Sequence, residues 1–183
     1  MKAMRGTRRV VIGVMGSGRE PHEDLAEPLG KWLAESGFDL LTGGGGGVMA
    51  SVSRAFCGVS GRTGISIGVL PGDLDDEGNY VRRDGYPNDW VELPIRTHLP
   101  LSGKRGTARL SRNHLNVLSA DVIVALPGST GTRSELELAV RYGRPAILFL
   151  GDGTPPVGWP EVPVVRSIDE VRGFVRASVR SEF

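Results

Sequence analysis

Hydrophobic residues fall into two alternating patterns along this chain. Short continuous apolar runs occupy residues 10–15, 38–41, 65–70, 121–126 and 145–150. Such runs are typical of strands buried on both faces of a sheet. Between them, apolar side chains recur every three or four residues, as at Leu25, Leu29 and Leu33, which indicates helices that pack through one face. Strands that alternate with helices predict an α/β fold, a doubly wound parallel sheet with helices on both faces.

Weaker patterns predict the remaining elements. We expect helices at 101–119, 132–142 and 167–180, the last of them opened by a capping box of Ser167 and Glu170. The polar segment 73–89 is expected to be a long loop, equally suited to covering a site or to being plain surface, and residues 90–93 and 164–165 are expected to be short strands. Together these elements predict a single domain over residues 1–183, with its core in 10–150.

Composition narrows the classes of partner. The 183 residues carry a net charge of +1, which gives no argument for nucleic acid or an acidic membrane as a partner. Cys57 is the one cysteine, so neither an internal disulfide nor a cysteine-based zinc site is expected, and a cytoplasmic location is predicted. The three histidines are scattered, so we predict no metal site. No apolar run approaches the ~20 residues that a membrane helix needs.

Glycine is abundant, with 27 residues, and three glycine turns, at 16–18, 43–47 and 128–131, each follow a predicted strand. Parallel strands end at one sheet edge, where ligands bind. A glycine turn that leads into a helix presents free backbone N–H groups at the positive end of the helix dipole. These turns therefore predict a phosphate site, although the run 43–47 is also compatible with a tight connection that binds nothing.

Two common nucleotide motifs are absent. The turn 16–18 does not meet the Gly-x-Gly-x-x-Gly spacing cleanly, and no acidic residue ends the second strand to hold a ribose, which disfavours NAD. Gly103-Lys104 is not a P-loop, because no strand precedes it and Arg105 stands where Ser or Thr is required.

Two charged residues are candidates for chemistry, and each has an alternative interpretation. Glu135 follows the glycine turn at 128–131, yet the segment 132–135 also matches a capping box, in which the glutamate caps its own helix. Arg112 shares helical spacing with Arg105, Arg109 and Asn116, a stripe that is usually a solvated polar face.

The chain resembles the LONELY GUY (LOG) and molybdenum-cofactor-carrier-like superfamily, whose members were often mislabelled lysine decarboxylases. The LOG pattern Pro-Gly-Gly-x-Gly-Thr-x-x-Glu is matched by residues 127–135 except at Ser129, and Arg112 lies at the required fifteen positions before Pro127. Residues 13–17, 41–49 and 67–71 resemble earlier signatures of the family, so the resemblance covers about 10–150. It implies a Rossmann-like nucleotide-binding fold, and commonly a homodimer.

The resemblance also implies an activity and a site. Arg112 and Glu135 would be the catalytic pair of a phosphoribohydrolase, which splits a nucleoside 5′-monophosphate such as AMP into free base and ribose 5-phosphate. No metal or other cofactor would be required. The residues that would bind the nucleotide and its phosphate are Gly16, Ser17, Gly44, Gly45, Gly46, Gly47, Met49, Pro127, Gly128, Ser129, Thr130, Gly131 and Thr132.

The alternative is a non-catalytic protein that carries molybdenum cofactor or senses a nucleotide. Ser129, where LOG proteins have glycine, and Asn113, where they more often have lysine, favour this alternative. Ala50 stands where LOG proteins usually have glycine after the methionine, a third departure from their pattern. The bound ligand would then be molybdopterin or a nucleotide such as AMP. Lysine decarboxylation is rejected, because that chemistry normally holds pyridoxal on a lysine and none of Lys2, Lys31 and Lys104 has a matching context.

Overall fold

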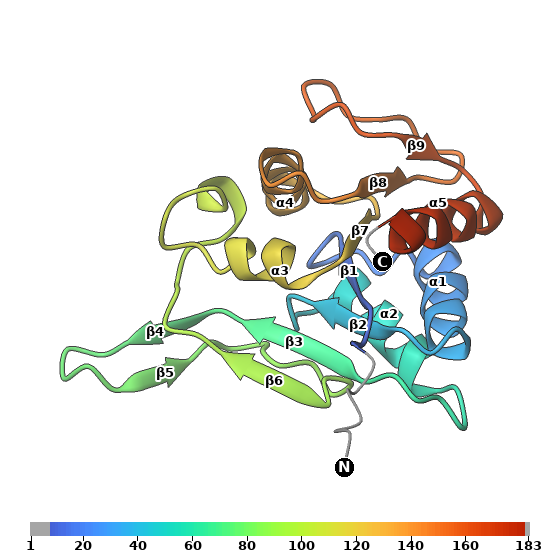
Figure 1. Ribbon diagram of the computed structural model, residues 1–183. Helices are drawn as coiled ribbons and strands as arrows, with labels where there is room; N and C mark the ends of the chain where they lie inside the picture. The colour runs from blue at the N-terminus through green and yellow to red at the C-terminus, as the bar shows by residue number, and fades with distance from the viewer. Residues whose placement is uncertain (1–7, 182–183) are drawn as a thin grey trace, which may run out of the picture.

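A seven-stranded parallel sheet forms the centre of the computed structural model, which describes residues 8–181 (Figure 1). The strands lie in the order β6-β3-β2-β1-β7-β8-β9. Their bounds are β1 Val11–Met15, β2 Asp39–Thr42, β3 Ser66–Leu70, β6 Leu93–Arg96, β7 Val122–Ala125, β8 Ala146–Phe149 and β9 Val164–Val165. All the neighbouring strands pair in parallel, which confirms the predicted sheet.

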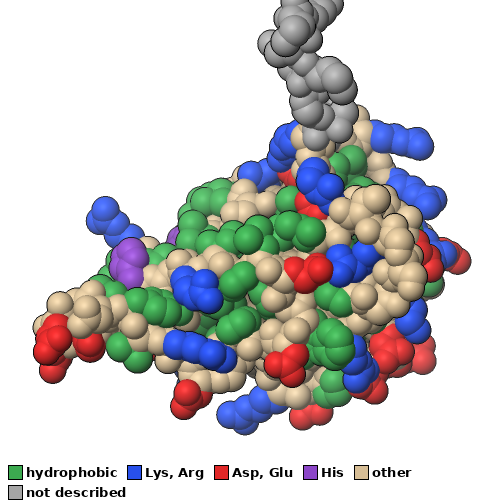
Figure 2. Space-filling model, turned by 90° about the horizontal axis from the view of Figure 1, so that it is seen from below, with side chains coloured by type: hydrophobic (Ala, Val, Ile, Leu, Met, Phe, Trp, Pro, Cys, Tyr) green, Lys and Arg blue, Asp and Glu red, His purple; other side chains and the backbone are tan. Residues whose placement is uncertain are grey.

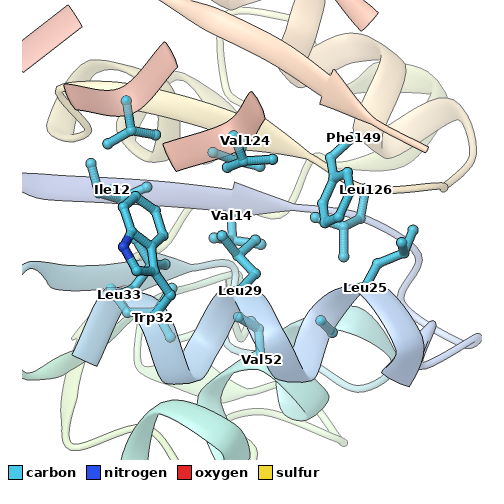
Figure 3. Close-up of a cluster of buried hydrophobic side chains, with 14 of the residues drawn as sticks. Ile12, Val14, Leu25, Leu29, Trp32, Leu33, Val52, Val124, Leu126 and Phe149 are labelled. Carbon is cyan, nitrogen blue, oxygen red and sulfur yellow. The ribbon is translucent and has the colours of Figure 1, made fainter. Parts of the chain in front are cut away.

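Helices cover both faces of the sheet, which confirms the doubly wound, Rossmann-like prediction. One face packs against α1 (Glu23–Glu35), α2 (Val48–Cys57) and α5 (Ile168–Ser181), through side chains such as Leu29, Val52 and Val175. In Figure 3, Leu29 and Leu33 of α1 face Ile12 and Val14 of β1. The opposite face packs against α3 (Asn113–Ser119) and α4 (Thr130–Arg141). Within residues 8–181 no helix is long and apolar enough to cross a membrane.

The sheet changes its winding direction at β1, which pairs with β2 on one side and with β7 on the other. The connections that leave β1 and β7 therefore run to opposite faces, toward α1 and α4. A crevice opens outside the carboxyl ends of two such strands, and this is where doubly wound sheets bind ligands. The turns that follow β1, β2 and β7 all lie at this edge, as predicted.

The continuous helix expected at 101–119 is wrong. Only α3 is an α-helix there, preceded by a short 3-10 turn, η1 (Gly103–Arg105), and a bridge between Leu101 and Ser111. Gly103 has φ +57, a left-handed conformation that stops a helix. A Cβ on Gly106 would overlap the hydroxyl of Ser134, so the segment 101–112 packs closely on α4.

The loop expected at 73–89 contains regular structure. Strands β4 (Gly72–Leu74) and β5 (Tyr80–Arg82) form an antiparallel hairpin that projects from the body and carries acidic side chains at its end (Figures 1 and 2). The strand expected at 90–93 is shifted to β6, because Asn88 accepts hydrogen bonds from the backbone N–H groups of Trp90 and Val91 in a turn.

The predicted capping box at the start of α5 is confirmed. The Glu170 carboxylate accepts hydrogen bonds from the Ser167 backbone N–H at 2.8 Å and from the Ser167 hydroxyl at 2.9 Å. The Ser167 hydroxyl oxygen in turn accepts from the Glu170 N–H at 3.3 Å. These bonds fix the first turn of α5.

Candidate functional site

A pocket of about 140 Å³ lies at the carboxyl ends of β1 and β7, where the winding of the sheet reverses. Residues from six separate segments line it. They are Met15, Gly16, Gly18, Met49, Tyr86, Ser102, Gly103, Arg112, Asn113, Ser129, Gly131, Thr132 and Glu135. Arg112 and Glu135 are the two charged residues in this lining.

The start of α4 supplies the backbone donors of the pocket. Ser129 is the N-cap of α4, but its side chain makes no capping hydrogen bond to the backbone N–H groups of the first turn. These N–H groups stand at the positive end of the helix dipole, beside Gly131 and Thr132 of the pocket lining. The hydroxyl of Thr132 is buried and has no hydrogen-bond partner within residues 8–181. This end of α4 can accept an anion.

Arg112 is a buried cation, with a side chain 4% exposed. One guanidinium nitrogen, Nη1, donates a hydrogen bond to the backbone carbonyl of Val69 at 3.0 Å. Its Nε has no partner in the part of the chain that the structure describes. The guanidinium also lies over the ring of Tyr86, 6.0 Å from the ring centroid. The solvated-stripe interpretation is therefore wrong for Arg112 and for the fully buried Asn116, whereas Arg105 and Arg109 are exposed.

Glu135 is a buried acid that faces α3. Its Oε1 accepts a hydrogen bond of 2.8 Å from Nδ2 of Asn116, and the residue is 7% exposed. Burial raises the pKa of the Glu135 carboxyl above its ordinary value, while the positive charge of Arg112 and the Asn116 hydrogen bond act in the opposite direction. The capping-box interpretation is wrong, because α4 begins at Thr130 and Glu135 lies in its second turn.

The glycine turns divide into residues that line the pocket and residues that hold its loops together. Of the thirteen predicted nucleotide-binding residues, the pocket lining includes Gly16, Met49, Ser129, Gly131 and Thr132. The other eight are not part of the lining. They are Ser17, Gly44, Gly45, Gly46, Gly47, Pro127, Gly128 and Thr130.

Backbone hydrogen bonds join the three turns. The Ser17 N–H donates to the Pro127 carbonyl at 3.0 Å, and the Val48 N–H donates to the Ser17 carbonyl at 2.9 Å. Gly47 has φ +58, and a Cβ there would overlap the backbone at Ser17. The Ser17 hydroxyl oxygen accepts hydrogen bonds from the N–H groups of Arg19 and Glu20, so it serves its own turn.

The five-glycine run makes room for two side chains of the pocket. A Cβ on Gly43 would overlap the guanidinium of Arg112, and a Cβ on Gly45 would lie 2.9 Å from the ring of Tyr86. Asn88 fixes this arrangement, because its N–H donates to the Gly44 carbonyl and its side-chain amide to the Gly45 carbonyl, each at 2.8 Å. The absence of side chains at 43 and 45 therefore shapes the wall that Arg112 and Tyr86 form.

We expect Gly43→Ala to displace Arg112 without unfolding the protein. The methyl group meets a guanidinium at the end of a flexible side chain, which can move. The prediction is a loss of activity of at least about tenfold with a melting temperature within a few degrees of wild type. Gly173→Ala is the stability control, because Gly173 lies in α5 without a left-handed backbone and has open space around it. A fully active Gly43→Ala protein would contradict this role for Gly43.

Sequence reasoning missed several residues of the pocket, among them Tyr86, Ser102, Gly103 and Asn113. Tyr86 comes from the segment 73–89, which was expected either to cover a site or to be plain surface. Its position beside the pocket depends on contacts with residues forty positions earlier, which no local pattern records. Asn113 follows Arg112, and its amide donates to the Ser134 hydroxyl at 2.9 Å, which joins α3 to α4.

Comparison with known proteins identifies the family. The profile of the SLOG cluster4 family matches residues 9–176. The chain belongs to the SLOG cluster4 family. An uncharacterised protein of Archaeoglobus fulgidus is 30% identical over 135 residues, which cover 73% of this chain and 75% of that protein.

Another relative of this SLOG chain is the rice (Oryza sativa subsp. japonica) cytokinin riboside 5′-monophosphate phosphoribohydrolase LOG. It is 30% identical over an alignment that covers 94% of this chain and 66% of the rice protein, so the chain spans slightly less than two thirds of that relative. The predicted membership of the LOG-like superfamily is confirmed.

Solved structures of cofactor-binding proteins share the fold. The molybdenum cofactor binding protein of Rippkaea orientalis superposes with a TM-score of 0.71 at 27% identity, covering 94% of this chain and 99% of that one. The Moco carrier protein of Chlamydomonas reinhardtii gives a TM-score of 0.70 at 31% identity, with coverages of 95% and 99%. The chain is therefore similar in sequence to a named hydrolase and in fold to named cofactor-binding proteins.

Proposed function

We propose that this protein is a phosphoribohydrolase that cleaves the N-glycosidic bond of a nucleoside 5′-monophosphate such as AMP. One observation carries the proposal: Arg112 and Glu135, from different elements, are both buried and both line the pocket at the start of α4. A buried carboxyl group and a buried guanidinium that form no close ion pair with each other are poor stabilisers of a fold. Such groups are typical of active sites.

The start of α4 would hold the 5′-phosphate. Its uncapped backbone N–H groups and the unpartnered Thr132 hydroxyl are donors, and a phosphate offers several acceptor oxygens. Arg112, which also lines the pocket, would contribute positive charge through guanidinium nitrogens that the Val69 carbonyl leaves free. The substrate would thus be fixed by its phosphate, with the ribose over the floor of the pocket.

Glu135 would act on the glycosidic bond. Bond cleavage develops positive charge on the ribose, which a nearby carboxylate stabilises, and the same carboxylate can remove a proton from the attacking water. The raised pKa of Glu135 brings the carboxyl closer to the working pH, which suits a group that must bind and release a proton. Arg112 would keep this acid oriented and favour its ionised form.

The experiment is a direct assay. Purified protein incubated with AMP should release adenine and ribose 5-phosphate in equal amounts. The adenine is measured by chromatography and the ribose 5-phosphate by an enzymatic assay. Adenosine, which lacks the phosphate, should be cleaved far more slowly. Failure to cleave AMP and the other common nucleoside monophosphates would overturn the proposal.

A carrier of molybdenum cofactor is the second candidate, and the structural likeness to the Rippkaea and Chlamydomonas proteins favours it. The phosphate of molybdopterin would use the same start of α4, and Asn113, tied to Ser134, would be part of the lining. Native mass spectrometry of the protein as purified discriminates the two candidates. A co-purified pterin with no hydrolysis of AMP would favour the carrier.

We further propose that the protein is a homodimer, with its interface on the outer face of α3 and α4. Exposed apolar side chains gather there, among them Leu115 and Leu118 of α3 and Val140 of α4. Multi-angle light scattering should give twice the 19.5 kDa chain mass, and Leu118→Glu should yield monomers. A wild-type mass equal to one chain would contradict the dimer. The cytoplasmic location stays a prediction.

A further inference from the structure

Asn116 occupies an unusual position for an amide side chain. It is fully buried on α3, one turn after Arg112, and its Nδ2 donates to Oε1 of Glu135 at 2.8 Å. Arg112, the N-cap of α3, and Asn116, within α3, thus both act on the same acid. Asn116 does not line the pocket, so it would act on a ligand only through Glu135.

The other end of this amide is unsatisfied. Oδ1 of Asn116 is buried and accepts no hydrogen bond from any residue in 8–181. A buried polar atom without a partner is costly, and a fold that needed only shape at this place could use an apolar side chain at lower cost. The unpaired oxygen therefore indicates a role in which both ends of the amide are used.

The proton cycle of Glu135 supplies such a role. The ionised carboxylate has only acceptors and is matched by the Nδ2 donor, as observed. The neutral acid carries an O–H donor, which needs an acceptor. Rotation of the amide by half a turn presents Oδ1 in the same place and meets that need. Leucine offers neither group, and aspartate adds a like charge.

We propose that Asn116 is a positioning residue that holds the Glu135 side chain in one orientation while that acid gains and loses its proton. The inference rests on the proposed function for its kinetic consequence, but its structural part concerns the ligand-free protein. Arg112, at the N-cap of α3, is the charged group that acts on Glu135, and Tyr86 is the other titratable group in the pocket lining. Both stay unchanged when Asn116 alone is replaced.

The first arm of the test needs no substrate. The pKa of Glu135 is measured by infrared difference titration of its carboxyl band, assigned with Glu135→Gln. Asn116→Leu and Asn116→Ala should both raise this pKa, because the hydrogen bond that favours the ionised form is lost. Thr97→Val is the matched control, since it removes a buried hydrogen bond, to the Leu70 carbonyl, at a residue outside the pocket lining.

The second arm uses AMP hydrolysis. Asn116→Leu should lower kcat by between about 10-fold and 100-fold with little change in KM, the range expected for losing a hydrogen bond to a charged group. The acidic limb of its pH–rate profile should move to higher pH, and Thr97→Val should keep the wild-type profile. Asn116→Ala provides the same readout if the leucine variant does not fold.

The two arms separate the two proposals. An unchanged Glu135 pKa in folded Asn116→Leu or Asn116→Ala protein would overturn the positioning role, whatever the activity. Absence of AMP hydrolysis by wild type, with the expected pKa change in the variants, would overturn the hydrolase and leave the role of Asn116 standing.

Discussion

Replacing Glu135 by glutamine should lower AMP hydrolysis by at least about 100-fold, the range for loss of a general acid or base. Glutamine keeps the size of the side chain and can still meet Asn116 after rotation of one amide. It can neither balance positive charge on the ribose nor accept a proton from water. Because the start of α4 is untouched, AMP should still bind. Turnover is measured by adenine release and binding by calorimetry, and wild-type turnover by Glu135→Gln would refute the assigned mechanism.

Glu135→Gln should also make the protein more stable than wild type, and this difference in the free energy of unfolding should grow as the pH rises. Since burial raises the pKa of Glu135, the folded state binds more protons than the unfolded state between the ordinary and the raised pKa. Below that window, the burial of Glu135 therefore costs the wild-type protein no stability. As the pH rises through the window, the wild-type free energy of unfolding falls. Glutamine does not titrate. Urea denaturation at pH 4 and pH 8 should show a larger advantage for Glu135→Gln at pH 8. An equal difference at both pH values would contradict the burial argument.

The second large effect is expected from Arg112→Met, with a loss of at least about 100-fold in kcat/KM. Methionine fills much of the same volume beside Gly43 but removes the positive charge, which would bind phosphate and which lowers the pKa of Glu135. Both losses act together, so kcat should fall and KM should rise. The pH–rate profile should also shift to higher pH, because a larger fraction of Glu135 stays protonated at a given pH.

Arg112→Lys tests geometry against charge. Lysine restores the charge as a compact ammonium, without the planar set of donors that reaches the Val69 carbonyl and the pocket at once. We expect recovery of less than about a tenth of the activity, because positioning and charge both contribute. Arg109→Met is the matched control on an exposed arginine nearby and should behave as wild type. Full activity of Arg112→Lys would assign the whole effect to charge.

The sheet was predictable because its signals are local. A strand buried on both faces has to be a continuous apolar run, and the glycine turns that follow have to lie where such strands end. The segment 101–112 was mispredicted because Arg105, Arg109 and Arg112 carry helical spacing, whereas Gly103 and Gly106 allow the chain to lie against α4. That preference comes from tertiary contact, and spacing along the chain does not record it.

The candidate site was only partly predictable for the same reason. Glu135 fits a capping box and a buried acid equally well in sequence, and the start of α4 at Thr130 decides between them. The helical spacing of Arg112 with other polar residues predicts a solvated side chain, whereas in the structure Val69 and Gly43 enclose its guanidinium. Tyr86 reaches the pocket through the Asn88 contacts with the glycine run, a link between distant segments. The family resemblance directed attention to Arg112 and Glu135 but contains none of these contacts.

The bonds that join the three glycine turns have a consequence for how such proteins can diverge. Backbone hydrogen bonds alone connect Ser17, Val48 and Pro127, so the arrangement of the three turns does not depend on the side chains that they present to the pocket. Ser129 can stand in place of a glycine because it is exposed at the start of α4 and outside those bonds. The same backbone arrangement can therefore be kept while the surrounding side chains differ, in one protein to hydrolyse a ligand and in another to carry it.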